Sequence, residues 1–480
     1  FVPFLNICKE NHTAIRIGVN HGSLSDRIMS RYGDTPEGMV ESCMEFLRIC
    51  VQENFTDVVI SIKASNTVVM VKTVRLLAAV MEQEGMRFPL HLGVTEAGDG
   101  EDGRIKSALG IGALLADGLG DTIRVSLSEA PEAEIPVARK LVDYIVQRHD
   151  HPYIPGADVP EFNYLSPTRR ETAAVHNIGG DNLPVVIAAR LDGDMDFNPQ
   201  FVPDYIYTGR SIPEQLPEGM QCIIDADVWM EHSNGGTEPD NAWPAFKGDQ
   251  LPFLSSCGAS LKFLFITYMG LNDEAIACLK YHPEVVLVSQ SNHPNRLGEQ
   301  RALVHQMMKE GLKNPVVFFE HYAESELENL QIKAAADMGA LIFDGLCDGI
   351  LLFNQGETIS GKVVDATAFG ILQAGRVRTS KTEYISCPGC GRTLYDLEST
   401  IARIKAATDH LKGLKIGIMG CIVNGPGEMA DADYGYVGAG RGKISLYKKK
   451  ECIEKNIPEE EAVEKLIELI KNNGDYAERT

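Results

Sequence analysis

The sequence predicts an α/β protein with three parts: a partial TIM-type barrel, a second barrel-like domain inserted after it, and a small α+β domain. Short apolar segments typical of buried strands alternate with helical patterns over residues 1–150, and a second such series fills residues 151–378. Apolar strands that alternate with helices indicate a parallel sheet covered by helices. Residues 379–480 differ, because they carry a cysteine motif among glycines and prolines.

Residues 1–150 contain four strand–helix units. The expected strands are AIRIGVN, DVVISIKAS, FPLHLGVTEAG and TIRVSLS. A complete barrel needs eight such units over ~250 residues, so this part is either an open sheet or half of a barrel. The chain does not begin with Met. We therefore expect it to start within a longer protein, which favours half of a barrel.

Polar side chains lie in or just after these four strands. In a parallel α/β barrel the functional site lies at the carboxyl ends of the strands, and we expect these side chains to gather there. They are Arg16, Asn20, Lys63, Thr95, Glu96, Arg124 and Ser126. One basic residue at a strand end is usually a surface charge, whereas three on neighbouring strands indicate a pocket for a polyanion.

Residues 151–378 contain seven or eight further strand-like segments, enough for a complete barrel. They are LPVVIAARL, DYIYTG, QCIIDADVW, LKFLFITYM, EVVLVSQS, PVVFFEHYA, ALIFDG and GILLFN. Asp192, Asp194 and Asp196 resemble part of an EF-hand loop, but no Glu follows at the required spacing. We expect a solvated turn there, and no other motif of this part has a clear chemical meaning.

Residues 379–480 contain the motif CPGC, with Cys387 and Cys390, and later Cys421 at the end of the expected strand LKIGIMG. Three thiolates with Glu428, in the turn NGPGE, suit an iron–sulfur cluster with a replaceable ligand on one iron. The alternative is a zinc site with Cys452 or water as fourth ligand. One strand is expected in GKISLYKKKECIEKNIP and a closing helix in PEEEAVEKLIELIKNNG.

Composition narrows the class of protein. The chain has 480 residues, 44% of them hydrophobic, and a formal net charge of −22. The negative charge argues against nucleic acid or a membrane surface as partner, and no apolar run is long enough for a transmembrane helix. Seven further cysteines look like small buried hydrophobes of a reducing compartment. They are Cys8, Cys43, Cys50, Cys222, Cys257, Cys278 and Cys347.

Several motifs carry a resemblance to a known family. CPGCGRT and GCIVNGPGE, with IRIGVNHGSL, SIKAS, GVTEAG and TIRVSLS, resemble the 4-hydroxy-3-methylbut-2-enyl diphosphate synthases over residues 14–150 and 384–480. The resemblance implies reductive opening of 2-C-methyl-D-erythritol 2,4-cyclodiphosphate in the methylerythritol phosphate route to isoprenoids. It also implies roles for individual residues. A [4Fe-4S] cluster would be held by Cys387, Cys390, Cys421 and Glu428. The substrate diphosphate would be held by Arg16, Asn20, Lys63, Thr95, Arg124 and Ser126. Glu96, with Glu428, would be catalytic.

The long stretch between barrel and cysteines resembles the three-domain form known in plants and some bacteria. In the two-domain form the site pairs one subunit's barrel with its partner's cluster, and a long spacer allows one chain to close upon itself. The first barrel half is not in this chain, which implies an inactive fragment. The resemblance also implies ferredoxin or flavodoxin as electron donor and leaves a homodimer open. The location is the cytoplasm in a bacterium or the plastid stroma in a plant or alga.

The residues alone leave two alternative functions to consider. One is a non-catalytic metal-binding protein with the barrel as a scaffold. The other is a radical enzyme that uses S-adenosylmethionine, but its CxxxCxxC motif does not occur here.

Overall fold

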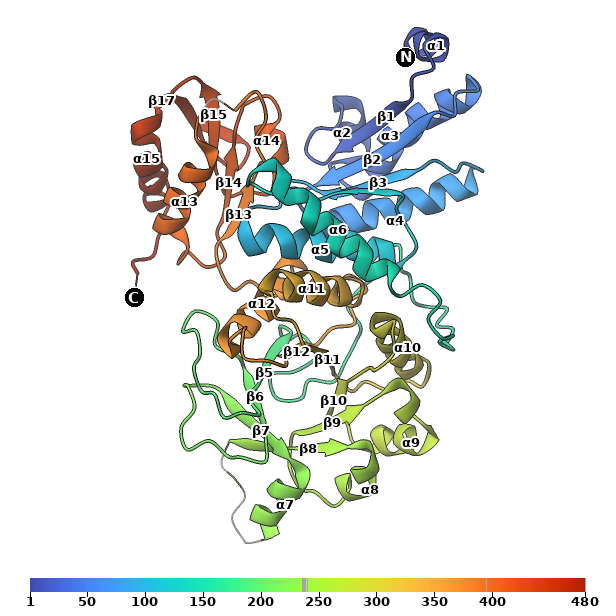
Figure 1. The fold of residues 1–480 in the computed structure, drawn as a ribbon, viewed down its shortest axis with the longest axis vertical. Coiled ribbons are helices and arrows are strands. Elements are labelled where there is room, and N and C mark those ends of the chain that lie inside the picture. Colours follow the sequence, from blue (N-terminus) through green and yellow to red (C-terminus); the bar gives the residue numbers. More distant parts are fainter. Residues whose placement is uncertain (235–238, 240, 394, 480) are drawn as a thin grey trace. The chain divides into compact units, whose positions relative to one another are not determined.

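The computed structural model describes residues 1–480 apart from 235–238, 240, 394 and 480, and it divides into two compact units (Figure 1). Unit 1 contains Phe1–Ile145 and Thr379–Thr480, and unit 2 contains Val146–Arg378. The segment before the inserted barrel and the segment after it therefore belong to the same unit.

Unit 1 begins with four parallel strands in the order β1-β2-β3-β4. The strands are β1 (Ile15–Asn20), β2 (Val58–Ala64), β3 (Leu90–Val94) and β4 (Thr122–Arg124). The helical elements are α1 (Val2–Glu10), α2 (Asp26–Tyr32), α3 (Pro36–Gln52), α4 (Thr67–Gln83), α5 (Gly100–Ala116), η1 (Pro131–Ala133) and α6 (Glu134–Val146). The four strands and helices α3 to α6 confirm the sequence prediction, whereas α1 and α2 are additional.

Local sequence explains where the long helices begin. Thr35 caps α3, because its hydroxyl accepts the backbone N–H of Gly38 at 3.1 Å, and Pro36 takes the first helical position. Asn66 caps α4 in the same way through the N–H groups of Val68 and Val69. The cap at Asn66 starts α4 two residues after β2 ends, whereas α2 lies between β1 and the capped start of α3.

The two faces of this sheet differ in polarity. Side chains such as Ile17, Ile60 and Leu92 are buried, and helices α3, α4 and α5 contact β1, β2 and β3. Side chains alternate between faces along a strand, so the residues between them share the opposite face. Apart from Val59, that set is polar or small: Arg16, Gly18, Asn20, Ser61, Lys63, His91, Gly93, Thr122 and Arg124. Helices on one face and polar groups on the other are typical of a barrel wall whose inner side carries the site.

Unit 2 is a closed barrel of eight parallel strands, which confirms the predicted second barrel (Figure 1). Its interior is filled by large apolar side chains, among them Tyr205, Phe263, Val317 and Leu351. The strands are β5 (Val185–Ala189), β6 (Tyr205–Gly209), β7 (Gln221–Asp225), β8 (Ala242–Lys247), β9 (Lys262–Ile266), β10 (Val285–Ser289), β11 (Val316–Tyr322) and β12 (Gly349–Asn354). The helical elements are α7 (Ala226–Asn234), η2 (Gly248–Gln250), α8 (Leu251–Leu254), η3 (Tyr268–Gly270), α9 (Asp273–Tyr281), α10 (Arg296–Lys309), α11 (Leu327–Phe343) and α12 (Gly361–Ala374).

One strand predicted in unit 2 is wrong. Residues 340–345, ALIFDG, contain the end of helix α11 and the turn that follows it. The second half of α11 is buried on all sides, so its apolar run lacks the helical period that would identify it. The eighth strand is instead β8, in which Pro244 hides the strand pattern, because proline is uncommon inside strands.

Residues 379–480 add a second, five-stranded sheet to unit 1, in the order β13-β14-β15-β16-β17. Its elements are β13 (Glu383–Ser386), α13 (Leu397–Thr408), β14 (Lys415–Met419), α14 (Gly425–Glu428), β15 (Tyr434–Gly440), β16 (Lys443–Lys448), β17 (Glu451–Pro458) and α15 (Glu459–Asn472). The single strand predicted in GKISLYKKKECIEKNIP is wrong, because Lys449, at a φ of 52°, turns the chain between β16 and β17.

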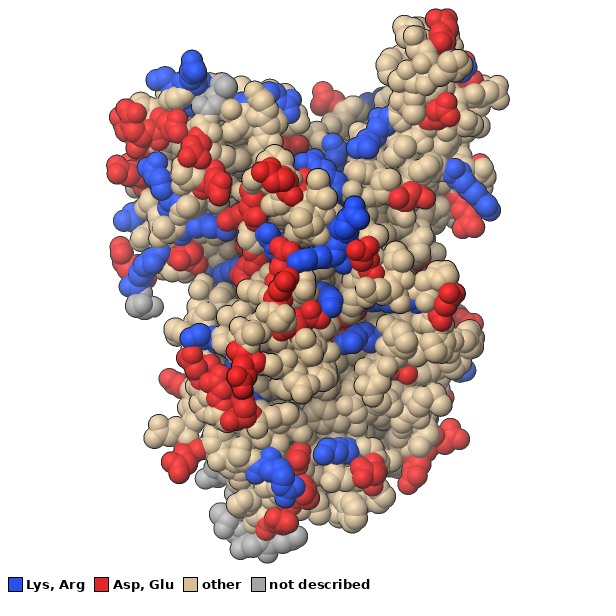
Figure 2. All heavy atoms as spheres, in the orientation of Figure 1, with Lys and Arg blue, Asp and Glu red and all other residues tan. Residues whose placement is uncertain are grey.

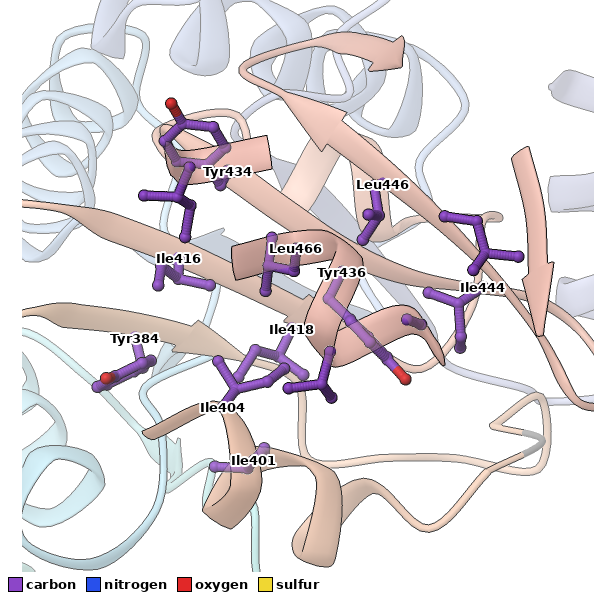
Figure 3. Packing of buried hydrophobic residues seen from close by; sticks show 14 of the residues in the cluster. Tyr384, Ile401, Ile404, Ile416, Ile418, Tyr434, Tyr436, Ile444, Leu446 and Leu466 are labelled. Atoms are coloured by element: carbon purple, nitrogen blue, oxygen red, sulfur yellow. The ribbon is translucent and has the colours of Figure 1, made fainter. Parts of the chain in front are cut away.

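A compact apolar core holds the second sheet to α13 and α15 (Figure 3). Ile416, Ile418 and Tyr436 from the central strands meet Ile404 of α13 and Leu466 of α15, and all five side chains are almost completely buried. This core fixes β13 and β14, the two strands from which the cysteine loops extend.

Charged side chains of both signs are interspersed over the visible surface (Figure 2). Lys and Arg side chains gather over unit 1 where its two sheets meet, against the negative charge of the whole chain. Among the described residues, no helix has both the length and the apolar composition needed to cross a membrane.

Candidate active site

Three of the predicted polar residues form one row across the first sheet. The strand register pairs Asn20 with Lys63, Lys63 with Gly93, and Gly93 with Arg124. Neighbours in the register of a parallel sheet point to the same face. Asn20, Lys63 and Arg124 therefore share the polar face close to the carboxyl ends of their strands, as predicted. Gly93 leaves room on β3 between the two cations.

Thr95 and Ser126 lie two residues further along, directly beyond β3 and β4. Thr95 continues the strand pairing, because its N–H donates to the carbonyl of Ala64 at 3.1 Å. Its hydroxyl donates to Glu96. Ser126 is buried. The structure therefore places both hydroxyl residues at the same sheet edge as the row.

Arg16 differs from the other cations, because it stands near the beginning of β1 and not at its end. Its charge nevertheless reaches the same region. Burial lowers the pKa of His91, and the positive charges of Arg16, Arg124 and Lys63 lower it further. His91 thus marks the place where three cations converge. Sequence reasoning missed this histidine, although its position two residues before Gly93 puts it on the polar face.

These cations have few acidic partners in the part of the chain that the structure describes. Lys63 and Arg16 make no ion pair there, and Arg124 has Glu134 at 4.0 Å. A surface that gathers cations without neutralising them is suited to a phosphorylated ligand.

Glu96 lies directly beyond β3 in an unusual environment. It is buried, its φ of 50° is in the left-handed region, and its Oε2 atom has no hydrogen-bond partner among the described residues. Burial raises its pKa to about 8, and the charge of Glu428 adds to the rise. The Thr95 hydroxyl and the charges of Arg124 and Lys63 oppose it. Glu96 therefore carries a proton at neutral pH.

Glu428 ends α14, which packs directly on the loop after β1. A Cβ atom added to Gly22 would lie 2.1 Å from the carbonyl oxygen of Gly427, so only glycine fits this contact. Burial raises the pKa of Glu428, while the charges of Lys63 and Arg392 lower it. The carboxylate is thus near both the cation row and the cysteine loop.

The cysteine loops extend from neighbouring strands of the second sheet. Cys387 follows β13, and its Sγ accepts the backbone N–H of Gly420, the residue before Cys421, at 3.2 Å. Burial raises the pKa of Cys387. Cys390 is exposed, and the backbone N–H and then the side chain of Arg392 lower its pKa. One loop thus carries a half-buried and an exposed thiol, with Cys421 beside them.

The four predicted ligands share one neighbourhood. Arg392 feels the charges of Cys390, Cys421 and Glu428, and the charges of Glu96 and Glu428 reach Cys387. Sequence reasoning did not single out Arg392, although it lies inside the motif CPGCGRT.

Three thiols and one carboxylate are donors that an iron–sulfur cluster can use. In the described chain, no three His, Cys, Asp or Glu side chains are close enough to hold one metal ion. A multi-iron cluster spaces its ligands more widely, because each ligand binds a different iron. The zinc alternative that uses Cys452 is wrong. Cys452 is on β17, four strands away from β13, or roughly 19 Å at the usual strand spacing.

Each of the four strand ends of the first sheet contacts the cysteine-bearing segment of the same chain. The contacts are Gly22 with Gly427 after β1, Ser65 with Glu428 after β2, Ala97 with Ser386 after β3, and Ser128 with Ser386 and Cys387 after β4. Ion pairs surround this junction, among them Lys381 with Asp102 and Lys405 with Asp99. The cation row and the cysteine loops therefore face each other within unit 1.

This arrangement is that of an α/β-barrel protein in which a group of cations at the strand ends lies near three cysteines and a glutamate. A family model described as the GcpE TIM-barrel domain matches residues 1–139, and one described as the GcpE protein C-terminal domain matches residues 383–472. Three similar proteins are named "4-hydroxy-3-methylbut-2-en-1-yl diphosphate synthase (flavodoxin)". Those of Bacteroides thetaiotaomicron, Bacteroides fragilis and Porphyromonas gingivalis are 81%, 79% and 49% identical to this chain. The matches cover 98%, 100% and 100% of this chain and 76%, 75% and 76% of the relatives. The chain belongs to the family of 4-hydroxy-3-methylbut-2-en-1-yl diphosphate synthases.

Proposed function

We propose that the protein converts 2-C-methyl-D-erythritol 2,4-cyclodiphosphate to 4-hydroxy-3-methylbut-2-enyl diphosphate in the methylerythritol phosphate route to isoprenoids. The membership of its family supports this activity. The observation that carries the proposal is the position of Lys63, whose charge acts on both Glu96 and Glu428. One cation of the anion pocket is thus close to the acid and to the cysteine centre at once.

The cyclic diphosphate would bind on the polar face of the first sheet. Lys63, Arg124 and Arg16 provide the positive charge that a diphosphate needs. Asn20, Thr95 and Ser126 provide neutral donors at the same edge, which orient the ring without adding charge.

Cys387, Cys390, Cys421 and Glu428 would hold a [4Fe-4S] cluster, which would supply the electrons for the reduction. The carboxylate is the weakest of these four ligands, because Cys thiolates are the usual partners of iron–sulfur clusters. We therefore assign to Glu428 the position that the substrate reaches.

Glu96 would act as the acid. The reaction breaks the bond between the tertiary carbon and its diphosphate oxygen, which opens the ring, and the bond between the neighbouring carbon and its secondary hydroxyl. The two added electrons form the new C=C bond between these carbons. The hydroxyl leaves as water once it takes a proton. Glu96 holds a proton at neutral pH because of its burial, so it can donate where an exposed carboxylate cannot.

The name of the relatives favours flavodoxin over ferredoxin as the electron donor, and we propose the same for this protein. We also propose a cytoplasmic location, since these relatives are bacterial. The predictions of a possible homodimer and of no nucleic-acid or membrane partner remain predictions.

An anaerobic preparation of the intact protein tests the function. After reconstitution with iron and sulfide, it should hold about four irons and turn over the cyclic diphosphate with reduced flavodoxin. Cys421→Ala should lose iron and turnover, whereas the matched variant Cys452→Ala should keep both. A colourless protein with one zinc and no turnover would support the non-catalytic rival.

A further inference from the structure

The acid candidate and the first cysteine are joined by a short stretch of backbone pairing. Ala97, the residue after Glu96, forms an isolated parallel bridge with Ser386, the residue before Cys387. Ser386 is completely buried and ends β13. Two segments far apart in the sequence thus meet one residue away from the acid and from the thiol.

Ser128, in the loop after β4, forms hydrogen bonds with both segments of this junction. Its Oγ atom lies 2.9 Å from Oγ of Ser386, 3.1 Å from the carbonyl oxygen of Ser386 and 3.1 Å from the carbonyl oxygen of Cys387. Its backbone N–H donates to the carbonyl of Gly98 at 3.0 Å. Since a hydroxyl has one proton, Ser128 can donate to one of the two carbonyls while it accepts the hydroxyl of Ser386.

The backbone conformation of Glu96 explains why the residues after it need to be restrained by hydrogen bonds. A non-glycine residue in the left-handed region is strained, and the conformation persists only where its surroundings hold it in place. The bridge at Ala97 and the hydrogen bond from Ser128 to Gly98 restrain the two residues that follow Glu96. Ser128 is buried as well, so water does not replace these bonds.

We propose that Ser128 is a positioning residue that sets the distance between the carboxyl of Glu96 and the iron–sulfur group at Cys387. This inference rests on the proposed function. Among the described residues, the hydrogen bonds of Ser128 go to Ser386, Cys387 and Gly98, and none goes to a cation of the row or to a cysteine sulfur. Ser128 acts through the backbone of Cys387 and through the loop that carries Glu96. Small displacements of a catalytic group have large effects on rate, so its loss should affect turnover more than substrate binding.

Ser128→Ala tests this role, with Ser107→Ala as matched control. Ser107 is also a completely buried serine of unit 1, and its hydroxyl has no hydrogen-bond partner among the described residues. In the reconstituted intact protein, Ser128→Ala should lower kcat by roughly ten- to a hundredfold, with KM and iron content close to wild type. The electron paramagnetic resonance spectrum of the reduced cluster should change. Ser107→Ala should leave all four quantities unchanged.

A measurement without cluster separates positioning from chemistry. In the apoprotein, hydrogen exchange should become faster in peptides that contain residues 94–99 and 384–390 of Ser128→Ala, and in no other part of unit 1. Ser386→Ala should give a similar change. The double variant should then show less than the product of the two single effects on kcat, because both remove the same contact.

The outcomes distinguish the two proposals. If the wild type turns over the substrate and Ser128→Ala has the same kcat, spectrum and exchange pattern, the positioning role alone is overturned. Loss of iron in Ser128→Ala, or multiplicative effects in the double variant, would overturn it too. A wild type that holds the cluster but does not turn over the cyclic diphosphate would contradict the proposed function. The changed spectrum and exchange would still support the role of Ser128.

Discussion

The charge of Glu428 helps to raise the pKa of Glu96 across the junction between the two sheets of unit 1. Glu96 follows β3, and Glu428 ends α14. Lys63 opposes the rise at both carboxyl groups. The burial of Glu96 and the charge of Glu428 outweigh the effect of Lys63, so Glu96 keeps its proton near neutral pH.

This proton makes stability depend on pH in a defined direction. Glu96 has a folded pKa of about 8, above its ordinary value of 4.5, so the folded state binds more protons than the unfolded state between these values. The free energy of unfolding therefore falls as the pH rises from 4.5 through about 8. Glu96→Gln removes this contribution, and its stability relative to wild type should increase from about pH 5 to about pH 9.

Denaturant titrations of both proteins across that range measure the difference. Glu132→Gln is the control, because Glu132 is an exposed carboxyl group of the same unit, and its difference from wild type should stay flat. A flat difference for Glu96→Gln as well would show that Glu96 is ionised in the folded protein.

The fold was predictable where local pattern and tertiary structure agree. The strands of the first sheet and most of the barrel have apolar cores bounded by turns, and α3 and α4 have capping residues. The prediction failed where burial removed the pattern. Residues 340–345 look like a strand because α11 is buried all around, and β8 was missed because of Pro244. Such elements are decided by what packs on them, which a single sequence does not show.

The candidate site divides in the same way. The cysteines, Glu428 and the strand-end cations stand out in the sequence by residue type and spacing. Ser128 and His91 do not, because their importance depends on register and on contacts with distant segments. In the sequence Ser128 looks like an ordinary loop serine, and only the folded structure shows that its hydroxyl contacts Ser386.

Lys63→Ala should weaken substrate binding and spare the cysteine centre. An ionic hydrogen bond contributes about 1.5–3 kcal/mol, so KM should rise roughly ten- to a hundredfold, with an unchanged cluster spectrum. Arg139→Ala is the control, because Arg139 is an exposed cation of α6 and should keep the wild-type KM. Steady-state kinetics with the cyclic diphosphate decide the matter, and an unaltered KM in Lys63→Ala would remove the lysine from the anion pocket.

Glu428→Cys tests whether a replaceable ligand is needed. A fourth thiolate should hold the cluster at least as well as the carboxylate, so the iron content should stay near wild type. Turnover should be lost, because a thiolate does not yield its place to the substrate. Glu398→Cys, at an exposed position of α13, controls for an added thiol and should remain active. Full activity of Glu428→Cys would mean that the reaction does not require an open position.

Gly22→Ala tests the contact that seats α14 on the first sheet. The new Cβ would lie 2.1 Å from the carbonyl oxygen of Gly427, next to Glu428, so α14 must move away. Gly85→Ala is the matched control. Both glycines have a positive φ, 82° and 71°, but nothing lies within 4 Å of a Cβ at Gly85. Both variants carry the backbone cost of left-handed alanine, about 1–2 kcal/mol, and only Gly22→Ala disturbs the junction. We therefore expect both variants to lose a comparable amount of stability from the backbone, and Gly22→Ala to lose more because of the clash. Only Gly22→Ala should also lower kcat, by at least roughly tenfold. Denaturant midpoints and kcat of the reconstituted proteins measure both effects. Equal behaviour of the two variants would show that α14 does not have to touch the β1 loop for the site to work.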